Sequence, residues 1–324
     1  MKELIRKVRA NHAIASALYA ATRPLHGLAR RFESWTSTHV FRNGGAAVYD
    51  GIDLHFPRNV GIALLTSISW RGVDGFEPET WAALRQLIRR SHTFVDIGAH
   101  VGLYSILAKR IAPAIDVISF EPVPELYDQN RAFHAANGLA PNAQQIAISD
   151  RDGVATLFRP EGGETPSSST LAVESWQARK PHTALSVRTV TLDSFLSGRP
   201  LRGPVTIKID VEDHEAAVLR GGADVIRKYK PAIVCEILPR PRRKNDRVGN
   251  EIISRGEQHE NAETLAILAE LNYSAFAITA DGYFRVGARD FREDRPFLNF
   301  LLLPTDEIDA SRHYFRDIPP RLPA

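Results

Sequence analysis

The sequence contains little sulfur and no long apolar segment. A single cysteine, Cys235, and a single methionine occur among 324 residues. One cysteine excludes an intramolecular disulfide framework and any zinc site that needs two or more thiolates. A run of about 18 apolar residues, the length that spans a membrane, is missing as well. We therefore expect no transmembrane span, and a lone free thiol is typical of the reducing cytoplasm.

The excess of one charge sign is also small, because the chain has 41 basic and 38 acidic residues and a net charge of +3. So small an excess does not favour nucleic acid as the partner. The remaining composition, 44% hydrophobic and 24% charged, is that of an ordinary globular protein. The length fits two domains, or one α/β domain with terminal additions.

The first 32 residues form a basic segment with apolar residues at helical spacing. Lys2, Arg6 and Lys7 are among its cations, and the pattern predicts an amphipathic helix. A secretory signal is the alternative, but the apolar part at residues 13–21 is short and contains Tyr19. The helix could contact a membrane surface peripherally.

Strand and helix patterns then alternate along the chain. Strand-like segments at 46–56 and 62–70 precede a helix at 78–90. Five apolar strands with intervening helices follow, and this order is typical of a doubly wound, mostly parallel α/β sheet. The expected strands are 94–98, 116–120, 144–148, 205–210 and 231–237, and the expected helices are 103–111, 124–137 and 215–229.

Two later strand patterns, at 273–279 and 296–303, follow a helix near 261–271 and predict an antiparallel edge. The patterns together divide the chain into three parts. These are a helical and β-rich extension at 1–69, one α/β domain at 70–305 and a tail at 306–324.

A glycine-containing turn follows the first strand of this sheet, where open α/β sheets bind ligands. The turn runs from Gly98 through Ala99 to Gly102, and it lacks the G-x-G-x-x-G spacing of dinucleotide sites. Asp96 at the strand end would repel a pyrophosphate, but it suits the cationic ammonium and sulfonium of S-adenosylmethionine. This spacing disfavours a nicotinamide-dependent oxidoreductase, which we keep as an alternative.

Polar residues also end the next two strands. Glu121, followed by Pro122, lies a little over 20 residues beyond Gly98, the separation at which a carboxylate holds the ribose hydroxyls of an adenosine. Ala147 and Ser149 end the third strand and would face the adenine, although Ser149 can equally belong to a plain turn. The joint occurrence of these features predicts a nucleoside site.

The motifs resemble those of the FkbM-type S-adenosylmethionine-dependent methyltransferases. The resemblance rests on FVDIGAHVGLYS, ISFEPVPELYDQNRAFHAAN, AISDRDGVATLF, SSST, VRTVTLDSFL, IKIDVEDHEAAVLRGG and PAIVCEI, in this order. It implies a class I, Rossmann-like methyltransferase fold and methylation of hydroxyl oxygens on sugars, polyketides and other secondary metabolites. It also implies that Asp96, Gly98 and Ala99 contact the methionine part of the cofactor, Glu121 the ribose, and Ala147 and Ser149 the adenine.

One position departs from the family pattern D-V-E-G-x-E, because Asp213 stands where the family has glycine. An aspartate can occupy a turn or cap a helix, so we expect the fold to survive. A close approach of the substrate to the backbone at this position is less certain.

Acidic residues and a histidine end the fourth strand, next to where a substrate would meet the methyl group. We expect Glu212 and His214 to take the proton of a hydroxyl acceptor and Asp210 to position it. The alternatives are an N-cap for Asp210 and a solvent-facing first-turn position for His214. The three could also ligate Mg²⁺ or Mn²⁺, but we predict no metal.

Two further segments suggest how an acceptor is held. Ser167–Thr170, before a helix expected around Trp176, could contact the substrate or the cofactor, or be a plain capped loop. Residues 239–247 carry five cations, which could bind an acidic, phosphorylated or carrier-bound acceptor, or remain a solvated loop. The sequence thus predicts O-methylation of a small hydroxylated metabolite or sugar, with a non-catalytic adenosine-binding protein as a second alternative.

Overall fold

The computed structural model describes residues 42–160, 169–171, 182–238, 257–287 and 298–308, together with residue 17 and the pairs 247–248 and 251–252. All structural statements concern these residues. Several predicted features lie outside them. They are the N-terminal amphipathic helix apart from residue 17, Ser167 and Ser168, the helix around Trp176, the basic segment 239–246 and the tail from residue 309.

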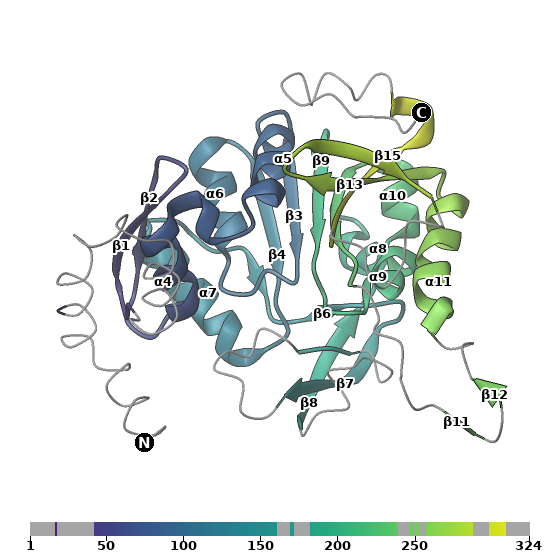
Figure 1. The fold of residues 1–324 in the computed structure, drawn as a ribbon, viewed down its shortest axis with the longest axis horizontal. Helices are drawn as coiled ribbons and strands as arrows, with labels where there is room; N and C mark the ends of the chain where they lie inside the picture. The colour runs from purple at the N-terminus through teal and green to yellow at the C-terminus, as the bar shows by residue number, and fades with distance from the viewer. Residues whose placement is uncertain are drawn as a thin grey trace.

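An eight-stranded sheet forms the centre of the molecule (Figure 1). Its strand order is β14-β13-β15-β10-β9-β3-β4-β5. The five strands from β10 to β5 are parallel, and β15, β13 and β14 are antiparallel. The bounds are β3 Thr93–Ile97, β4 Asp116–Phe120, β5 Ala143–Gln144, β9 Val205–Ile209, β10 Ala232–Glu236, β13 Tyr273–Thr279, β14 Gly282–Val286 and β15 Asn299–Pro304. This topology confirms the predicted doubly wound α/β fold with an antiparallel edge.

Helices cover both faces of the sheet because successive strand residues point to opposite sides. Phe94 packs into one apolar cluster with α5, α6 and α7, whereas Val95 packs into the other with α8, α9, α10 and α11. Both residues are fully buried, which explains the continuous apolar strands. The helices are α5 Pro78–Ile88, α6 Leu103–Ile111, α7 Pro124–Ala136, α8 Leu192–Leu196, α9 Glu215–Gly221, α10 Ala223–Tyr229 and α11 Glu257–Glu270.

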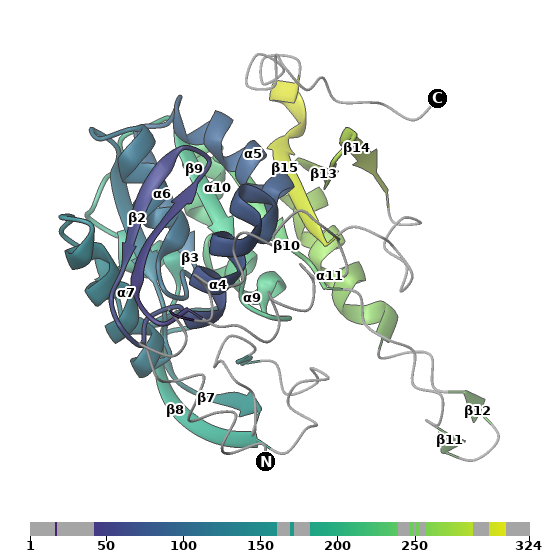
Figure 2. The ribbon, with the colours of Figure 1, turned by 60° about the vertical axis from the view of Figure 1, so that its left-hand side comes forward.

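A hairpin of β1 (Gly45–Tyr49) and β2 (Ile52–Phe56) lies over the layer that contains α6 and α7 (Figure 2). The Asn137 side chain binds it like a neighbouring strand: Oδ1 accepts from the His55 N–H and Nδ2 donates to the His55 carbonyl, each at 3.0 Å. The hairpin thus shares one apolar core with the helices. The predicted boundary at residue 69 therefore does not coincide with a break in packing.

The strand predicted at 62–70 is wrong, because these residues form helix α4 (Ile62–Arg71), followed by the short 3₁₀ helix η2 (Gly72–Gly75). Leu64, Leu65 and Ile68 are buried together, which is the spacing of one helical face. The β-branched residues of the segment favour a strand only weakly, and tertiary packing overrides that preference.

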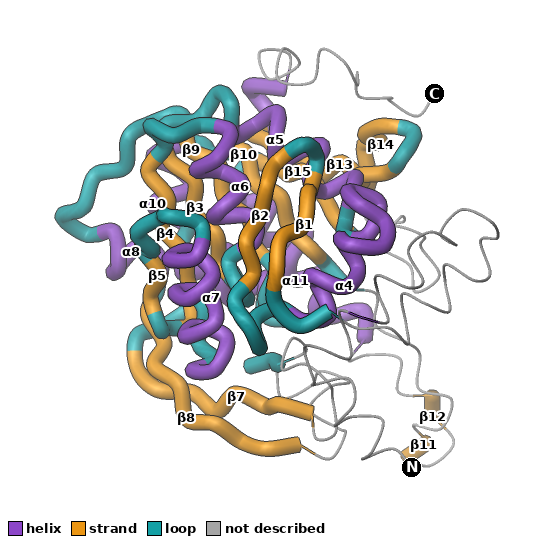
Figure 3. Tube along the Cα trace, turned by 90° about the vertical axis from the view of Figure 1, so that its left-hand side faces the viewer, coloured by secondary structure: helices purple, strands orange, loops and turns teal. Residues whose placement is uncertain are grey.

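Two other predicted elements are divided in the structure. The strand expected at 144–148 splits into β5, which pairs with β4, and β6 (Ala147–Ile148), which joins a second sheet. In that sheet β6 pairs with β8 (His182–Val190), and β8 pairs with β7 (Gly153–Pro160). Figures 1 and 3 show the β7–β8 ribbon projecting from the central sheet. The helix expected at 215–229 is two helices, α9 and α10, which meet at Gly222.

The helices of the described segments are short or polar. Within those segments, none combines the length and the apolar character that crossing a bilayer requires.

Candidate active site

A cavity of about 690 Å³ lies at the carboxyl ends of the parallel strands, where α/β sheets of this kind bind ligands. The strand ends supply one side of it. Ala63, Leu64, Thr66 and Ser67 of α4, with Phe76 and Glu77 before α5, supply another. The lining from the strand ends comprises residues 97–101, 120–123, 146–148 and 210–212 together with Lys208 and Glu236. Such a volume is that of a small-molecule site.

The glycine turn is fixed tightly against two neighbouring strands. Gly98 has a φ of 81°, and a Cβ there would lie 1.8 Å from the Asp210 carbonyl oxygen. The N–H groups of Gly98 and Ala99 both donate to the Phe120 carbonyl, at 3.0 and 2.9 Å. Gly98 and Ala99 line the cavity, as the cofactor prediction requires, whereas Gly102 lies outside the lining as the N-cap of α6. Only glycine fits at position 98, because any Cβ would collide with the end of β9.

Asp96 lies behind this turn and does not line the cavity. Its side chain is buried, and Oδ2 accepts a hydrogen bond of 2.7 Å from the Ser105 hydroxyl. Burial raises the pKa of the Asp96 carboxyl, against the opposing effect of Lys208. The other oxygen, Oδ1, is buried and has no hydrogen-bond partner among the described residues, and the contact of Asp96 with the methionine part remains a prediction.

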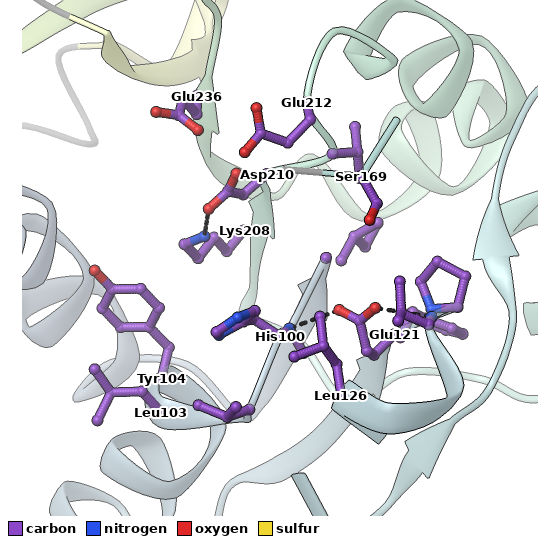
Figure 4. Close-up of a pocket in the computed structure, with 18 of the residues that line it drawn as sticks. His100, Leu103, Tyr104, Glu121, Leu126, Ser169, Lys208, Asp210, Glu212 and Glu236 are labelled. Carbon is purple, nitrogen blue, oxygen red and sulfur yellow. Dashed lines mark hydrogen bonds and ion pairs between the residues drawn. The ribbon is translucent and has the colours of Figure 1, made fainter. Parts of the chain in front are cut away.

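Glu121 faces the cavity with both oxygens already oriented (Figure 4). Oε2 accepts from the His100 N–H at 2.8 Å, and Oε1 accepts from the Val123 N–H at 2.9 Å. Burial raises the pKa of this carboxyl to about 7, although the two backbone donors favour the ionised form. Each oxygen keeps a lone pair for a further donor, so Glu121 can hold two neighbouring hydroxyls. Pro122 lines the cavity next to it.

The cavity end beside β6 is mainly apolar. Ile146, Ala147 and Ile148 line it. Ser149 does not line it; instead its hydroxyl lies 2.9 Å from Nε2 of His214. Burial lowers the pKa of His214 to about 4, so the ring is uncharged at neutral pH. His214 itself lines the cavity, with its Nε2 beside the Ser149 hydroxyl, and its role in proton transfer remains a prediction.

A buried ion pair occupies the opposite end. Lys208 Nζ donates to Asp210 Oδ2 at 2.7 Å and lies 5.0 Å above the centre of the Tyr104 ring. Although burial opposes it, the attraction of Lys208 holds the pKa of the Asp210 carboxyl below its ordinary value. Glu236, at the end of the neighbouring strand β10, lines the cavity beside Asp210. The Tyr104 hydroxyl donates to Glu77 at 2.8 Å, and burial raises the pKa of Glu77.

The sequence analysis did not single out four residues of this end: Glu77, Tyr104, Lys208 and Glu236. A signal existed for two of them, because Lys208 and Glu236 are charged residues inside otherwise apolar strands, VTIKI and AIVCE. Charged residues are almost never fully buried unless they are paired. Glu77 and Tyr104 carried no such signal.

The backbone after β9 is left-handed at two residues, which explains why the family pattern has glycine at the position of Asp213. Glu212 and Asp213 have φ values of 54° and 75°, in the left-handed region that glycine and aspartate tolerate best. The Asp213 N–H donates to Oε1 of Glu215 at 3.1 Å. The Thr170 hydroxyl donates to the Glu212 carbonyl, and Ser169 and Glu212 line the cavity. Asp213 therefore occupies the turn in place of the family glycine, and it does not line the cavity.

Within the described ranges, no three His, Cys, Asp or Glu side chains are arranged to hold an ion.

The FkbM methyltransferase domain model matches residues 96–275, more than half of the chain. The chain belongs to the FkbM methyltransferase family. This methyltransferase therefore uses S-adenosylmethionine as its cofactor, as predicted, and the match contradicts the nicotinamide alternative. The site fits that cofactor, because His100 Nε2 in the cavity wall is buried and lacks a hydrogen-bond partner within the described residues, which leaves a polar atom for a ligand.

Curated relatives agree with this assignment over part of their length. The 31-O-demethyl-FK506 methyltransferase FkbM of Streptomyces tacrolimicus is 29% identical over 177 residues, which are 46% of this chain and 66% of the relative. The hexuronic acid methyltransferase AglP of Haloferax volcanii is 23% identical over 141 residues, 43% of this chain and 53% of the relative. The matched segments thus span between about half and two thirds of these relatives.

A solved structure, the FkbM methyltransferase of Methylobacillus flagellatus, is similar at 14% identity with a TM-score of 0.35. The match covers 66% of this chain and 43% of that one.

Proposed function

We propose that this enzyme transfers a methyl group from S-adenosylmethionine to a hydroxyl oxygen of a small, hydroxylated acceptor such as a sugar or a secondary metabolite. The observation that carries the proposal is one cavity with two different ends. The Gly98 turn and Glu121 form a nucleoside end, and Asp210 and Glu236 form an acidic end. The names of the relatives, which concern FK506 and a hexuronic acid, support a hydroxylated small molecule.

In this proposal the nucleoside end holds the cofactor by contacts that the chain has already oriented. Glu121 accepts from the two ribose hydroxyls, and the backbone of Gly98 and Ala99 binds the methionine part. The apolar residues 146–148 form the adenine slot. When bound, the cofactor supplies an electrophilic methyl carbon on a positively charged sulfur. The ionised Asp210 favours that charge at the other end.

The acidic end also limits the charge of the acceptor. Four carboxyl groups, those of Glu77, Asp210, Glu212 and Glu236, line this end of the described part of the cavity, against one lysine, Lys208, which is paired with Asp210. An acidic acceptor would be repelled there. We therefore favour an uncharged acceptor over the acidic one suggested by the basic segment at 239–247.

In the proposed reaction, the walls align the acceptor oxygen with the methyl carbon, and this alignment supplies much of the acceleration. Phe76, Leu103 and Tyr104 surround the acidic end and exclude water from it. The acceptor hydroxyl must also lose its proton during the attack, and the carboxyl groups of this end lie where they can take it.

The test begins with cofactor binding, measured by titration calorimetry with S-adenosylhomocysteine. Glu121→Gln should weaken binding about 10- to 100-fold, because it removes a charged acceptor from two hydrogen bonds. Glu125→Gln is the matched control, since this exposed glutamate binds Arg159 on the surface. Equal affinities in the two variants would refute the site.

The acceptor atom is then identified with methyl-labelled cofactor and a cell extract. Mass spectrometry of the labelled product should locate the label on an oxygen of a small molecule. A label on nitrogen, carbon or a macromolecule would overturn O-methylation.

A further inference from the structure

Glu236 ends β10, and its carboxyl group faces the cavity beside Asp210 (Figure 4). β10 pairs with β9 in the register Cys235↔Ile209, so Glu236 and Asp210 are the next residues on two neighbouring strands, and both line the cavity. Two neighbouring carboxyl groups repel each other when both are ionised, so one of them favours the protonated form. Lys208 Nζ, 2.7 Å from Asp210 Oδ2, fixes the negative charge on Asp210. The proton of the pair therefore resides on Glu236.

The charged groups that face Glu236 explain why it holds this proton. Asp210 and Glu212 face it from the end of β9, and Glu77 faces it from the start of α5. Lys208 is the cation that the described residues place at this end, and it is already paired with Asp210. Burial and these carboxyl groups raise the pKa of Glu236 to about 11. A positive charge brought among them would favour release of the proton.

We propose that Glu236 gives up its proton when the positively charged cofactor binds and then receives the proton of the acceptor hydroxyl during methyl transfer. The inference rests on the proposed function. It assigns the proton step to Glu236 in place of Glu212 and His214, the residues predicted from the sequence.

The step balances in atoms and charge. The new bond joins the acceptor oxygen to the methyl carbon, and the old bond from that carbon to sulfur breaks with its electron pair left on sulfur. The O–H bond of the acceptor breaks, and Glu236 takes its proton. The positive charge on sulfur is lost at the same moment, so Glu236 returns to the neutral form that its surroundings favour. Each turnover releases one proton to solvent, at the next cofactor binding.

The test counts protons on binding and needs no acceptor. S-adenosylmethionine carries the positive sulfur, whereas S-adenosylhomocysteine is matched but lacks the charge. Calorimetric titrations in buffers of different ionisation enthalpy give the number of protons released by each compound. We expect the first to release more protons than the second, with a difference of up to one.

Glu236→Gln should abolish this difference while both compounds still bind, because the amide is neutral, as the protonated acid is. Glu215→Gln is the control: Glu215 is buried, its pKa is raised to about 8, and it does not line the cavity. This variant should keep the difference. Equal proton counts in the wild type, or a difference that persists in Glu236→Gln, would overturn the inference. Failure of both compounds to bind would overturn the proposed function instead.

With an acceptor identified, Glu236→Gln should lower kcat about 10²- to 10⁴-fold, the usual contribution of a general base. The KM for the cofactor should change little by comparison. An unchanged kcat would place proton removal elsewhere.

Discussion

Gly98→Ala tests the contact on which the cofactor end depends. The glycine turn and the end of β9 are so close that an alanine Cβ would lie 1.8 Å from the Asp210 carbonyl oxygen, whereas real Cβ contacts stay above 3.0 Å. The turn and the β9 end must therefore separate by about 1.6 Å to restore an ordinary contact of 3.4 Å. That movement strains the hydrogen bond of 3.0 Å from the Asp210 N–H to the Ile97 carbonyl.

The expected loss of stability follows from three contributions. A positive φ costs alanine about 1 kcal/mol. Loss of one backbone hydrogen bond costs about 1 kcal/mol, and the forced movement of packed strands costs about 1–3 kcal/mol. The sum, about 3–5 kcal/mol, is a large part of the stability of a typical domain. Gly138→Ala is the control, because Gly138 has a φ of 69° but no atom lies within 4 Å of its Cβ position. It should lose only about 1 kcal/mol.

Urea unfolding of the wild type and both variants measures these losses, and titration with S-adenosylhomocysteine measures the cofactor end. Gly98→Ala should bind at least about tenfold more weakly, since a 1.4 kcal/mol disturbance of the turn suffices for that. Gly138→Ala should bind normally. If the two variants lost equal stability within about 0.5 kcal/mol, the common uncertainty of such comparisons, the close contact between turn and strand would be refuted.

Two further predictions concern titration and charge. The carboxyl of Glu121 has a pKa of about 7, and ribose hydroxyls donate to its ionised form. Affinity for S-adenosylhomocysteine should therefore rise with pH through this value, and well below it the affinity should fall up to about tenfold per pH unit. Calorimetry across this pH range measures the profile. The same flat profile in the wild type and in Glu121→Gln would contradict the prediction. Lys208→Met leaves the buried Asp210 without its cation and should lower the free energy of unfolding by about 3–5 kcal/mol at neutral pH. This loss of unfolding free energy should be smaller in acid, because protonation removes the unpaired charge of Asp210. Urea unfolding measures the loss at neutral and at acidic pH, and equal losses would count against the ion pair.

The sequence predicted the sheet and the cofactor end because both follow from local pattern. Strands buried on both faces are continuous apolar runs, and their carboxyl ends follow directly from their bounds. Gly98 and Glu121 lie at such ends, so their proximity could be inferred before the strand order was known. The position of the Asp96 side chain could not be inferred in this way, because Asp96 belongs to the strand itself and its Oδ2 accepts from Ser105 on α6.

The acidic end could not be predicted in the same way, because it depends on strand order. Lys208 and Glu236 become neighbours only through the pairing of β9 with β10. Glu77 reaches them from a segment more than 100 residues earlier in the chain. The helix at Ile62–Arg71 was missed for a related reason, since its buried face is defined by the hairpin and η2 against which it packs.

Part of the cavity wall precedes residues 96–275, which the family model covers. It is formed by Ala63, Leu64, Thr66, Ser67, Phe76 and Glu77. The proposed cofactor contacts, at residues 98–99, 121 and 146–148, all lie within the later stretch, which also holds Asp210 and Glu236. Under the proposed function, selection can thus reshape the earlier part of the wall without changing a residue that contacts the donor. Grafting the corresponding stretch from another family member onto this scaffold would then redirect methylation to a new compound while donor affinity is preserved.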